Sequence, residues 1–269
     1  MKIGKATVPR TSISTSDAHS IVIRGHDLSK ELIGKVSFVD HFFLLLTGHW
    51  PSEGQSAVLN ATLVAIAEHG LVPSVQAARM TFAAAPDAMQ GAVAAGILGC
   101  GSVVLGSSET AGRMFSEIDA QVQAGAAIDD AALEVMKAWR AAGRSLPGYG
   151  HPLHKERDER VGALFDAARA AGTDLRFVAI AEAAEALLPE VLGKPLRLNV
   201  SGAIPAVLLG AGFPVEGLKG VPMLARTAGL FAHMVEEIRQ PIGFALSYQA
   251  TREAQYDGEV PEGFGGHAA

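Results

Sequence analysis

Hydrophobic and polar residues alternate at helical spacing, or fill apolar runs of helical length, along most of the chain. The stretches with this character are Val36–Thr47, Ser52–Glu68, Ser74–Ala85, Ala88–Leu98, Ile128–Ala142, Val161–Ala171, Phe177–Leu188, Ile204–Leu209 and Pro222–Ile238. Residues 1–20 differ, because they are rich in Ser and Thr with the short alternation of small strands or an arm. Since so few stretches have strand character, we predict an all-α fold.

Turn residues set the expected ends of several helices. Gly48 to Pro51 should stop the first helix, Pro189 should stop the helix at 177–188, and Gly193 to Pro195 marks a turn. The long helix at 222–238 is expected to bury one apolar face, made of Leu224, Ala228, Phe231, Val235 and Ile238.

Composition narrows the class of protein. The 269 residues are 49% hydrophobic and 19% charged, which is typical of a globular chain with a real core. The net charge of −6 argues against nucleic-acid binding. A single cysteine, Cys100, and an N-terminus without an apolar signal segment fit a reducing cytoplasm. The apolar stretch Ala92–Leu105 is short and interrupted by glycines, so we expect no membrane span.

Candidate chemistry is concentrated in Pro147–Arg160. Two glycines precede His151, and Pro152 suits the first turn of a helix. This pattern predicts a histidine at a helix N-terminus, where free N–H groups favour anions, with Lys155 and Arg160 adding positive charge. An acidic substrate would suit such a site.

Two other interpretations of this segment stand beside that one. A Gly-His-Pro turn that opens a charged helix is also what a simple turn before a solvated face looks like. His151 and His154, three residues apart, are spaced so that they could share a metal ion, but no known zinc motif follows them.

The segment resembles the Gly-His segment of the citrate synthase family, in its Pro-Gly-Tyr-Gly-His run and in Asp158-Glu159-Arg160. That superfamily includes the citryl-CoA lyase module of ATP-citrate lyase. Further segments resemble the family in the same order along the chain: Ile21–Leu28, Gly48–Pro51, Glu68–Gly70, Gly99–Phe115, Leu196–Gly202 and the segment around Arg226. The resemblance implies a citrate synthase-like fold that works as a homodimer or higher homo-oligomer. It has a large helical domain, residues 1–104 and 206–269, and a smaller one, residues 105–205, hinged over a cleft.

The resemblance also implies a set of site residues and no metal. By position, it gives His69 and His151 to the substrate's oxygen atoms, and Arg160 and Arg226 to its carboxylates. Lys155 would meet a phosphate of coenzyme A, and Arg239 would supply a last arginine, although it follows Arg226 more closely than is usual in the family. For His69 the residues alone also allow a structural role, because histidine and then glycine suit the C-terminal end of a helix.

Two positions depart from citrate synthases. Val104 stands where those enzymes have the histidine that holds the acetyl-CoA carbonyl, and ATP-citrate lyase also has an apolar residue there. Ser201 stands where both have an aspartate that moves the proton of the acetyl methyl group. A serine is too weak an acid or base for that step unless another group activates it. It could equally make only a local turn hydrogen bond.

The function that these features imply is cleavage of a coenzyme A thioester at a C–C bond. Citryl-CoA, or a related hydroxyacyl-CoA, would give acetyl-CoA and oxaloacetate, with coenzyme A entering as part of the substrate. Two alternatives remain open. One is a catalytically lapsed homologue that binds coenzyme A or an organic acid, and the other is a lyase for a different hydroxyacyl-CoA.

Overall fold

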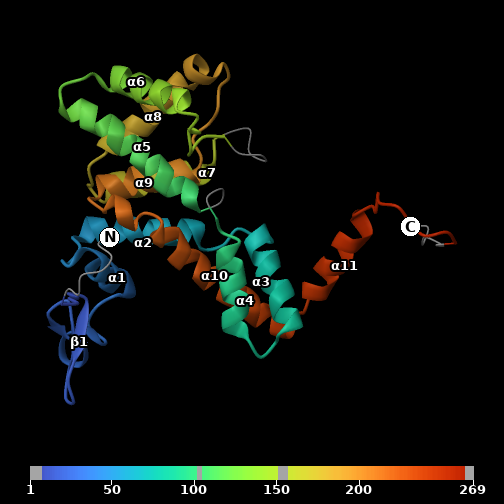
Figure 1. Cartoon of the computed structure of the whole chain (residues 1–269). Helices are drawn as coiled ribbons and strands as arrows, with labels where there is room; N and C mark the ends of the chain where they lie inside the picture. Colours follow the sequence, from blue (N-terminus) through green and yellow to red (C-terminus); the bar gives the residue numbers. More distant parts are fainter. Residues whose placement is uncertain (1–7, 102–104, 151–156, 264–269) are drawn as a thin grey trace. The chain divides into compact units, whose positions relative to one another are not determined.

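The structure is a computed structural model that describes residues 8–101, 105–150 and 157–263. It confirms the all-α prediction, since helices make up most of the described chain (Figure 1). The three short antiparallel strands are β1 (Ser14–Ser16), β2 (Ile21–Ile23) and β3 (His26–Asp27). They pair in the order β1-β2-β3, with Ser14 opposite Ile23 and Ile23 opposite His26. None of the described helices is long and apolar enough to cross a membrane.

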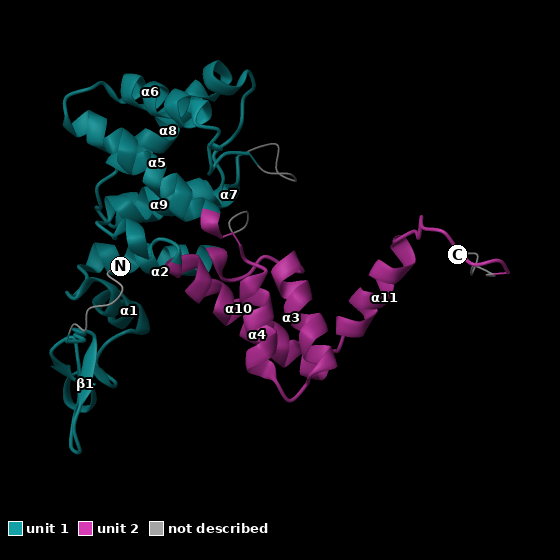
Figure 2. Ribbon diagram, viewed as in Figure 1, with its two compact units in different colours: residues 1–65, 107–219 teal, residues 66–106, 220–269 magenta. Residues whose placement is uncertain are grey.

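The chain divides into two compact units, each built from two separate segments (Figure 2). Unit 1 comprises residues 1–65 and 107–219, and unit 2 comprises residues 66–106 and 220–269. The predicted small domain, residues 105–205, falls in unit 1 apart from its first two residues. That unit also contains the N-terminal segment and continues to residue 219, so the hinged domains remain a prediction.

Unit 1 is organised around α9 (Val200–Gly210), which is buried along almost its whole length. It packs on α7 (Glu159–Ala170) and α8 (Arg176–Leu192), and α8 packs on α6 (Ile128–Ala141). The remaining elements of this part are the π-helix η1 (Leu28–Leu32), α1 (Phe38–Thr47), α2 (Glu53–Ala67), α5 (Gly106–Gln123) and the 3-10 helix η2 (Val215–Gly217). The last two residues of α2 and the first residue of α5 belong to unit 2.

Unit 2 contains α3 (Pro73–Ala84), α4 (Met89–Leu98), α10 (Gly220–Arg239) and α11 (Gly243–Glu253). The helices α3 and α4 pack on each other, and α10 packs on both. Their shared core consists of Val75, Ala78, Phe82, Ala92, Val93, Leu230 and Met234. Gly96 permits this packing, because a Cβ atom there would lie 2.7 Å from Cδ1 of Leu230.

The apolar face predicted for the long helix was wrong. On α10, Phe231, Val235 and Ile238 are 46%, 42% and 63% exposed. The buried face instead carries Ala225, Arg226, Gly229, Leu230, Met234 and Glu237. A hydrophobic pattern predicts that charged residues such as Arg226 and Glu237 face solvent. Both are buried here, so the buried face differs from the predicted one.

One predicted helix boundary was also wrong. Pro189 does not stop α8, which continues for three residues and ends where Gly193 has a φ of 71°. The N–H of Gly193 still bonds to the Pro189 carbonyl at 2.9 Å, so the last turn closes without the missing proline N–H. The helix predicted at Val161–Ala171 is α7, which begins at Glu159 with Asp158 as its cap, while Pro152 lies outside the described residues.

Candidate functional site

His69 lies in unit 2, in the turn that follows α2. That turn reverses at Gly70, which has a φ of 73°, as the glycine after a helix end often does. One carboxylate oxygen of Glu68, Oε1, accepts the backbone N–H of His69 at 2.8 Å and that of Gly70 at 2.5 Å. The turn is therefore fixed by its neighbour, and the His69 residue itself is exposed.

Arg226 is the most unusual charged residue of the described chain. It lies on the buried face of α10 and is only 4% exposed. Its Nε and Nη1 atoms are buried, with no hydrogen-bond partner among the described residues. A buried cation without a partner is costly, so such a group indicates a place that an anion fills. Carboxylates and phosphates are the anions that a guanidinium binds through strong, charge-assisted hydrogen bonds.

Arg239 is the last residue of α10 and is exposed. At 1.5 Å and 100° per residue, thirteen residues place it about 20 Å along the helix from Arg226 and on a different face. The helix therefore does not bring these two arginines together, and a substrate role for Arg239 remains a prediction.

Arg160 lies in unit 1, in the first turn of α7, and is held by the residue that caps that helix. Asp158 accepts the backbone N–H of Arg160 at 3.1 Å, its Nε at 3.0 Å and its Nη2 at 2.7 Å. Burial raises the pKa of Asp158, but these bonds and the N–H of Val200 outweigh it and hold the pKa below its usual range. Asp158 therefore stays ionised and fixes the guanidinium.

Ser201 lies on α9, which packs on the helix α7 that carries Arg160, and the N–H of the preceding residue, Val200, is one of the groups that lower the pKa of Asp158. Ser201 occupies the first turn of α9 and not a loop, and it is partly buried. The cap of this helix is Asn199, whose side chain accepts the Ser201 N–H at 2.9 Å. The alternative that Ser201 makes only a local turn hydrogen bond agrees with the structure in this one respect, because Ser201 does form a local hydrogen bond through its backbone N–H. Arg160 and Ser201 thus lie in the first turns of two helices, α7 and α9, that pack on each other.

His151 and Lys155 lie outside the described residues, as do His154 and Val104. The described residues on either side are bonded to the segment that leads into α9 and to the middle of α8. Before the gap, the Gly150 carbonyl accepts Nδ2 of Asn199 at 2.6 Å, and the Gly150 N–H bonds to the Arg197 carbonyl at 2.7 Å. After it, Arg157 lies 3.3 Å from Glu182 and 3.5 Å from Glu185, two acidic residues on α8.

Sequence reasoning missed several residues that hold the site. Asp158, Asn199 and Glu68 each position a predicted site residue through a backbone or side-chain hydrogen bond. A signal was available for two of them, because Asp and Asn are preferred immediately before a helix. The sequence offered no such signal for the two hydrogen bonds that Glu68 accepts from the turn after it.

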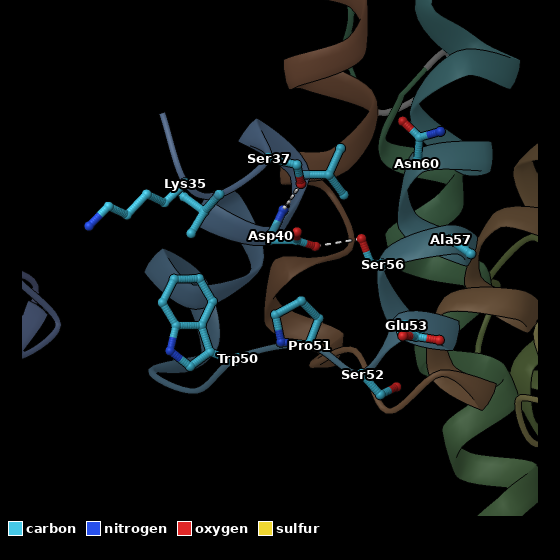
Figure 3. A pocket seen from close by; sticks show the side chains of 12 residues that line it. Lys35, Ser37, Asp40, Trp50, Pro51, Ser52, Glu53, Ser56, Ala57 and Asn60 are labelled. Carbon is cyan, nitrogen blue, oxygen red and sulfur yellow. Dashed lines mark hydrogen bonds between the residues drawn. The ribbon is translucent and has the colours of Figure 1, made fainter. Parts of the chain in front are cut away.

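A separate pocket of about 630 Å³ lies in unit 1, between α1 and the start of α2 (Figure 3). Lys35, Asp40, Trp50 and Glu53 are among its lining residues, and Asp40 accepts the hydroxyl of Ser56 at 2.5 Å. None of the described site residues lines it. Its mixture of one cation and two carboxylates indicates no particular ligand.

These features define a mainly helical protein with a histidine in the turn after α2, a buried arginine on α10 and an arginine in the first turn of α7. Residues 53–243 match the family described as citrate synthase, C-terminal domain. The chain belongs to the citrate synthase family.

Solved structures of similar fold include the citryl-CoA lyase from Hydrogenobacter thermophilus, at 32% identity and a TM-score of 0.82, over 95% of this chain and 96% of that one. An ATP citrate lyase from Methanosaeta concilii, in complex with (3S)-citryl-CoA, aligns with a TM-score of 0.76 over 97% of this chain and 43% of that one. Its identity of 24% shows the shared fold alone.

Curated relatives are citrate synthases. The Haloferax volcanii citrate synthase is 25% identical over 200 residues, which are 73% of this chain and 50% of that protein. Putative citrate synthase 2 of Mycobacterium tuberculosis is 28% identical over 213 residues, 78% of this chain and 55% of that protein. The chain thus spans about half the length of the curated relatives it matches.

Proposed function

We propose that the protein is a lyase that cleaves a C–C bond in a coenzyme A thioester, with citryl-CoA or a related hydroxyacyl-CoA as substrate. The observation that carries this proposal is Arg226, a buried guanidinium whose Nε and Nη1 have no partner among the described residues. A substrate carboxylate would supply the missing charge. The similarity to a citryl-CoA lyase over nearly the whole of both chains supports the same reaction class.

The reaction is a retro-Claisen cleavage. A base removes the proton of the tertiary hydroxyl, and the oxygen's electron pair forms the new carbonyl as the C–C bond breaks. The bonding pair of that C–C bond passes to the methylene carbon next to the thioester, which becomes the enolate of acetyl-CoA. Protonation of this carbon gives acetyl-CoA, and the other product is oxaloacetate. The protein must therefore supply a base, an acid and donors that meet the developing charges.

The proposed roles follow the family resemblance and the described contacts. His69 and His151 would act at the hydroxyl and the new carbonyl oxygen. Arg226 and Arg160 would bind carboxylates, the second already oriented by Asp158. Lys155 would meet a phosphate of coenzyme A, and Arg239 would contribute a further cation.

One sequence feature favours cleavage over condensation. Val104 offers no hydrogen bond to an acetyl-CoA carbonyl, and ATP-citrate lyase also has an apolar residue there. Ser201 lacks the carboxylate that would move the proton at the acetyl carbon, which should slow the reaction in either direction. Ser201 also motivates a second candidate function, a homologue that binds coenzyme A or an organic acid without turnover.

The test is to incubate the protein with citryl-CoA and a panel of related hydroxyacyl-CoA thioesters and to follow the free keto acid. We expect release of oxaloacetate from citryl-CoA, or of another keto acid from one member of the panel, and negligible citrate from acetyl-CoA and oxaloacetate. Replacing His151 with alanine should lower turnover by a factor on the order of 10² or more. Rapid citrate synthesis would contradict the lyase proposal, and binding of ligands without any turnover would favour the second candidate.

A further inference from the structure

The carboxylate that holds the His69 turn is itself held from the other side. While Oε1 of Glu68 takes the two backbone N–H groups, Oε2 lies 3.0 Å from Nε2 of His233 on α10. Burial raises the pKa of Glu68, but His233 and the N–H of Gly70 outweigh it and keep the pKa below its usual range. Glu68 is therefore an ionised bridge between the His69 turn and α10.

The surroundings of His233 fix which of its nitrogen atoms carries the proton. Its Nδ1 lies 3.4 Å from Nη1 of Arg79, and a guanidinium can only donate. Nδ1 must then be the acceptor, so Nε2 carries the hydrogen and donates it to Glu68. The imidazole side chain is 13% exposed, so little water competes for either bond.

Arg79 is a rigid support for this imidazole. Its side chain is 2% exposed, with Nε 2.6 Å from Glu237 and Nη1 2.5 Å from Glu236. Its Nη2 donates to the Gln240 carbonyl at 3.0 Å. The guanidinium is thus bonded on every nitrogen, and its position fixes the ring of His233.

Close packing of α10 against the end of α2 makes the contact possible. At Gly229, a Cβ atom would lie 2.1 Å from the Ala67 carbonyl oxygen and 3.0 Å from Oε2 of Glu68. Arg226, Gly229 and His233 are spaced by three and four residues, which places them on one side of the helix. The side of α10 that meets the His69 turn is therefore also the side that carries the unpaired arginine.

We infer that His233 is a positioning residue for His69, acting through Glu68 to fix the His69 turn relative to Arg226. This inference rests on the proposed function, in which His69 contacts the reacting oxygen. His233 itself would touch neither substrate nor product. Because a misplacement of about 1 Å can cost on the order of 10² in rate, a side chain that only fixes this turn can still control turnover.

The test compares two replacements of His233. In His233→Gln the amide NH₂ occupies about the place of Nε2 and can still donate to Glu68, whereas in His233→Asn it stops short. We expect His233→Asn to lower kcat on citryl-CoA by tenfold to a hundredfold, with KM changed by less than about threefold. His233→Gln should recover most of that loss. His19→Asn, the same change at an exposed histidine of the β1–β2 turn, should leave kcat unaltered.

A double-mutant cycle separates positioning from general damage. If His233 acts through His69, adding His233→Asn to His69→Ala should cost little further turnover. Losses that multiply in the double variant would overturn the inference, as would full activity of His233→Asn.

A second measurement does not depend on turnover. The Gly70 amide, bonded to Glu68, should exchange its hydrogen faster in His233→Asn by tenfold or more, and at close to the original rate in His233→Gln. If the unaltered protein cleaves no thioester of the panel, the proposed function is wrong. The positioning role of His233 is then tested by the hydrogen-exchange rates alone. Equal exchange in all three proteins would refute it.

Discussion

Arg226 combines two properties that rarely occur together in one side chain: it is almost completely buried, and two of its nitrogen atoms lack a partner in the described structure. Lysine would keep the charge but lose the planar pair of donors that matches a carboxylate. We therefore expect Arg226→Lys to weaken binding of oxaloacetate by about 1–3 kcal/mol, measured by titration calorimetry.

The control for this measurement is Arg169→Lys. Arg169 forms an exposed ion pair with Asp166 on α7, so its replacement should leave oxaloacetate affinity unaltered. Equal affinities of the Arg226→Lys variant and the unaltered protein would mean that Arg226 does not face the substrate.

Ser201 permits an unusually clean gain-of-function experiment. Because it lies in the first turn of α9, a carboxylate there is favoured by the helix dipole, and Ser201→Asp should fold normally. If the missing carboxylate limits the proton step, this variant should cleave citryl-CoA faster, by a factor on the order of ten or more. The readout is kcat, with Ser201→Asn as the uncharged control of similar size. No gain in Ser201→Asp from an active enzyme would show that another group handles this proton.

Single residues also show what the sequence could and could not reveal about the site. Motif order predicted His69, Arg160, Arg226 and Ser201 as site residues, and local preferences predicted the helix end at Gly70, which has a φ of 73°. His233 and its support Arg79 were not recognisable, because their partners are distant in sequence; Arg79 and Glu237, for example, are 158 residues apart. No local pattern records such a pair before the chain has folded.

At the scale of elements, the contact between α10 and the end of α2 depends on Gly229. A methyl group there would collide with the Ala67 carbonyl, so Gly229→Ala should destabilise the fold by about 1–3 kcal/mol, as overpacking does. Gly162 in α7 is the matched control, because a Cβ atom there meets nothing within 4 Å. Gly162→Ala should stabilise by about 0.5–1 kcal/mol through the better helix propensity of alanine. Urea unfolding measures both, and equal effects of the two changes would refute the close contact.

The link between α3, α10 and α11 should respond to pH. Burial raises the pKa of Glu237, but the N–H groups of Gly243 and Ile242 and the Arg79 guanidinium outweigh it and hold the pKa below its usual 4.5. A lowered pKa means that the folded state binds this proton less readily than the unfolded chain, so the stabilisation exists above pH 4.5 and is lost as the pH falls through the folded-state pKa.

Glu237→Gln tests this dependence. It removes the buried partner of Arg79 and leaves only Glu236, which is 54% exposed, so it should cost about 3–5 kcal/mol in the free energy of unfolding at neutral pH. The difference from the unaltered protein should narrow as the pH falls below 4.5, because the glutamate is then neutral as well. The exposed pair of Lys137 and Glu190 provides a control, since Glu190→Gln should cost less than about 1 kcal/mol at every pH. A cost for Glu237→Gln that does not vary with pH would contradict the proposed linkage.

Helices were predictable as elements, while their faces and ends were less so. The predicted helices at 36–47, 74–85 and 128–142 agree with α1, α3 and α6 to within two residues at each end. Periodicity failed on α10, where buried Arg226 and Glu237 shift the core face. The expectation that a proline ends a helix failed on α8, because its last turn needs no N–H from Pro189.

For the whole molecule, we predict self-association into a homodimer. The family resemblance implies it, and α10 and α11 carry large exposed apolar side chains, with Ile238 at 63%, Phe244 at 69% and Tyr248 at 64%. Light scattering after gel filtration should give about twice the chain mass of 27.9 kDa. Phe244→Glu should shift the protein toward monomer, whereas Ile33→Glu, at a residue 64% exposed in unit 1, should not. A monomer at micromolar concentration would rule the dimer out.

The interleaved construction of the two units governs how the chain must acquire its structure. The chain passes from one unit to the other three times, at residues 65–66, 106–107 and 219–220. A nascent chain released from the ribosome only as far as residue 219 contains every segment of unit 1, yet it lacks the Leu230 and Met234 that cover Val75, Phe82 and Val93. The α3–α4 pair then presents bare apolar surface until α10 emerges, which is the stage at which aggregation competes with folding. Protection by a chaperone would matter most while α10, residues 220–239, is being synthesised.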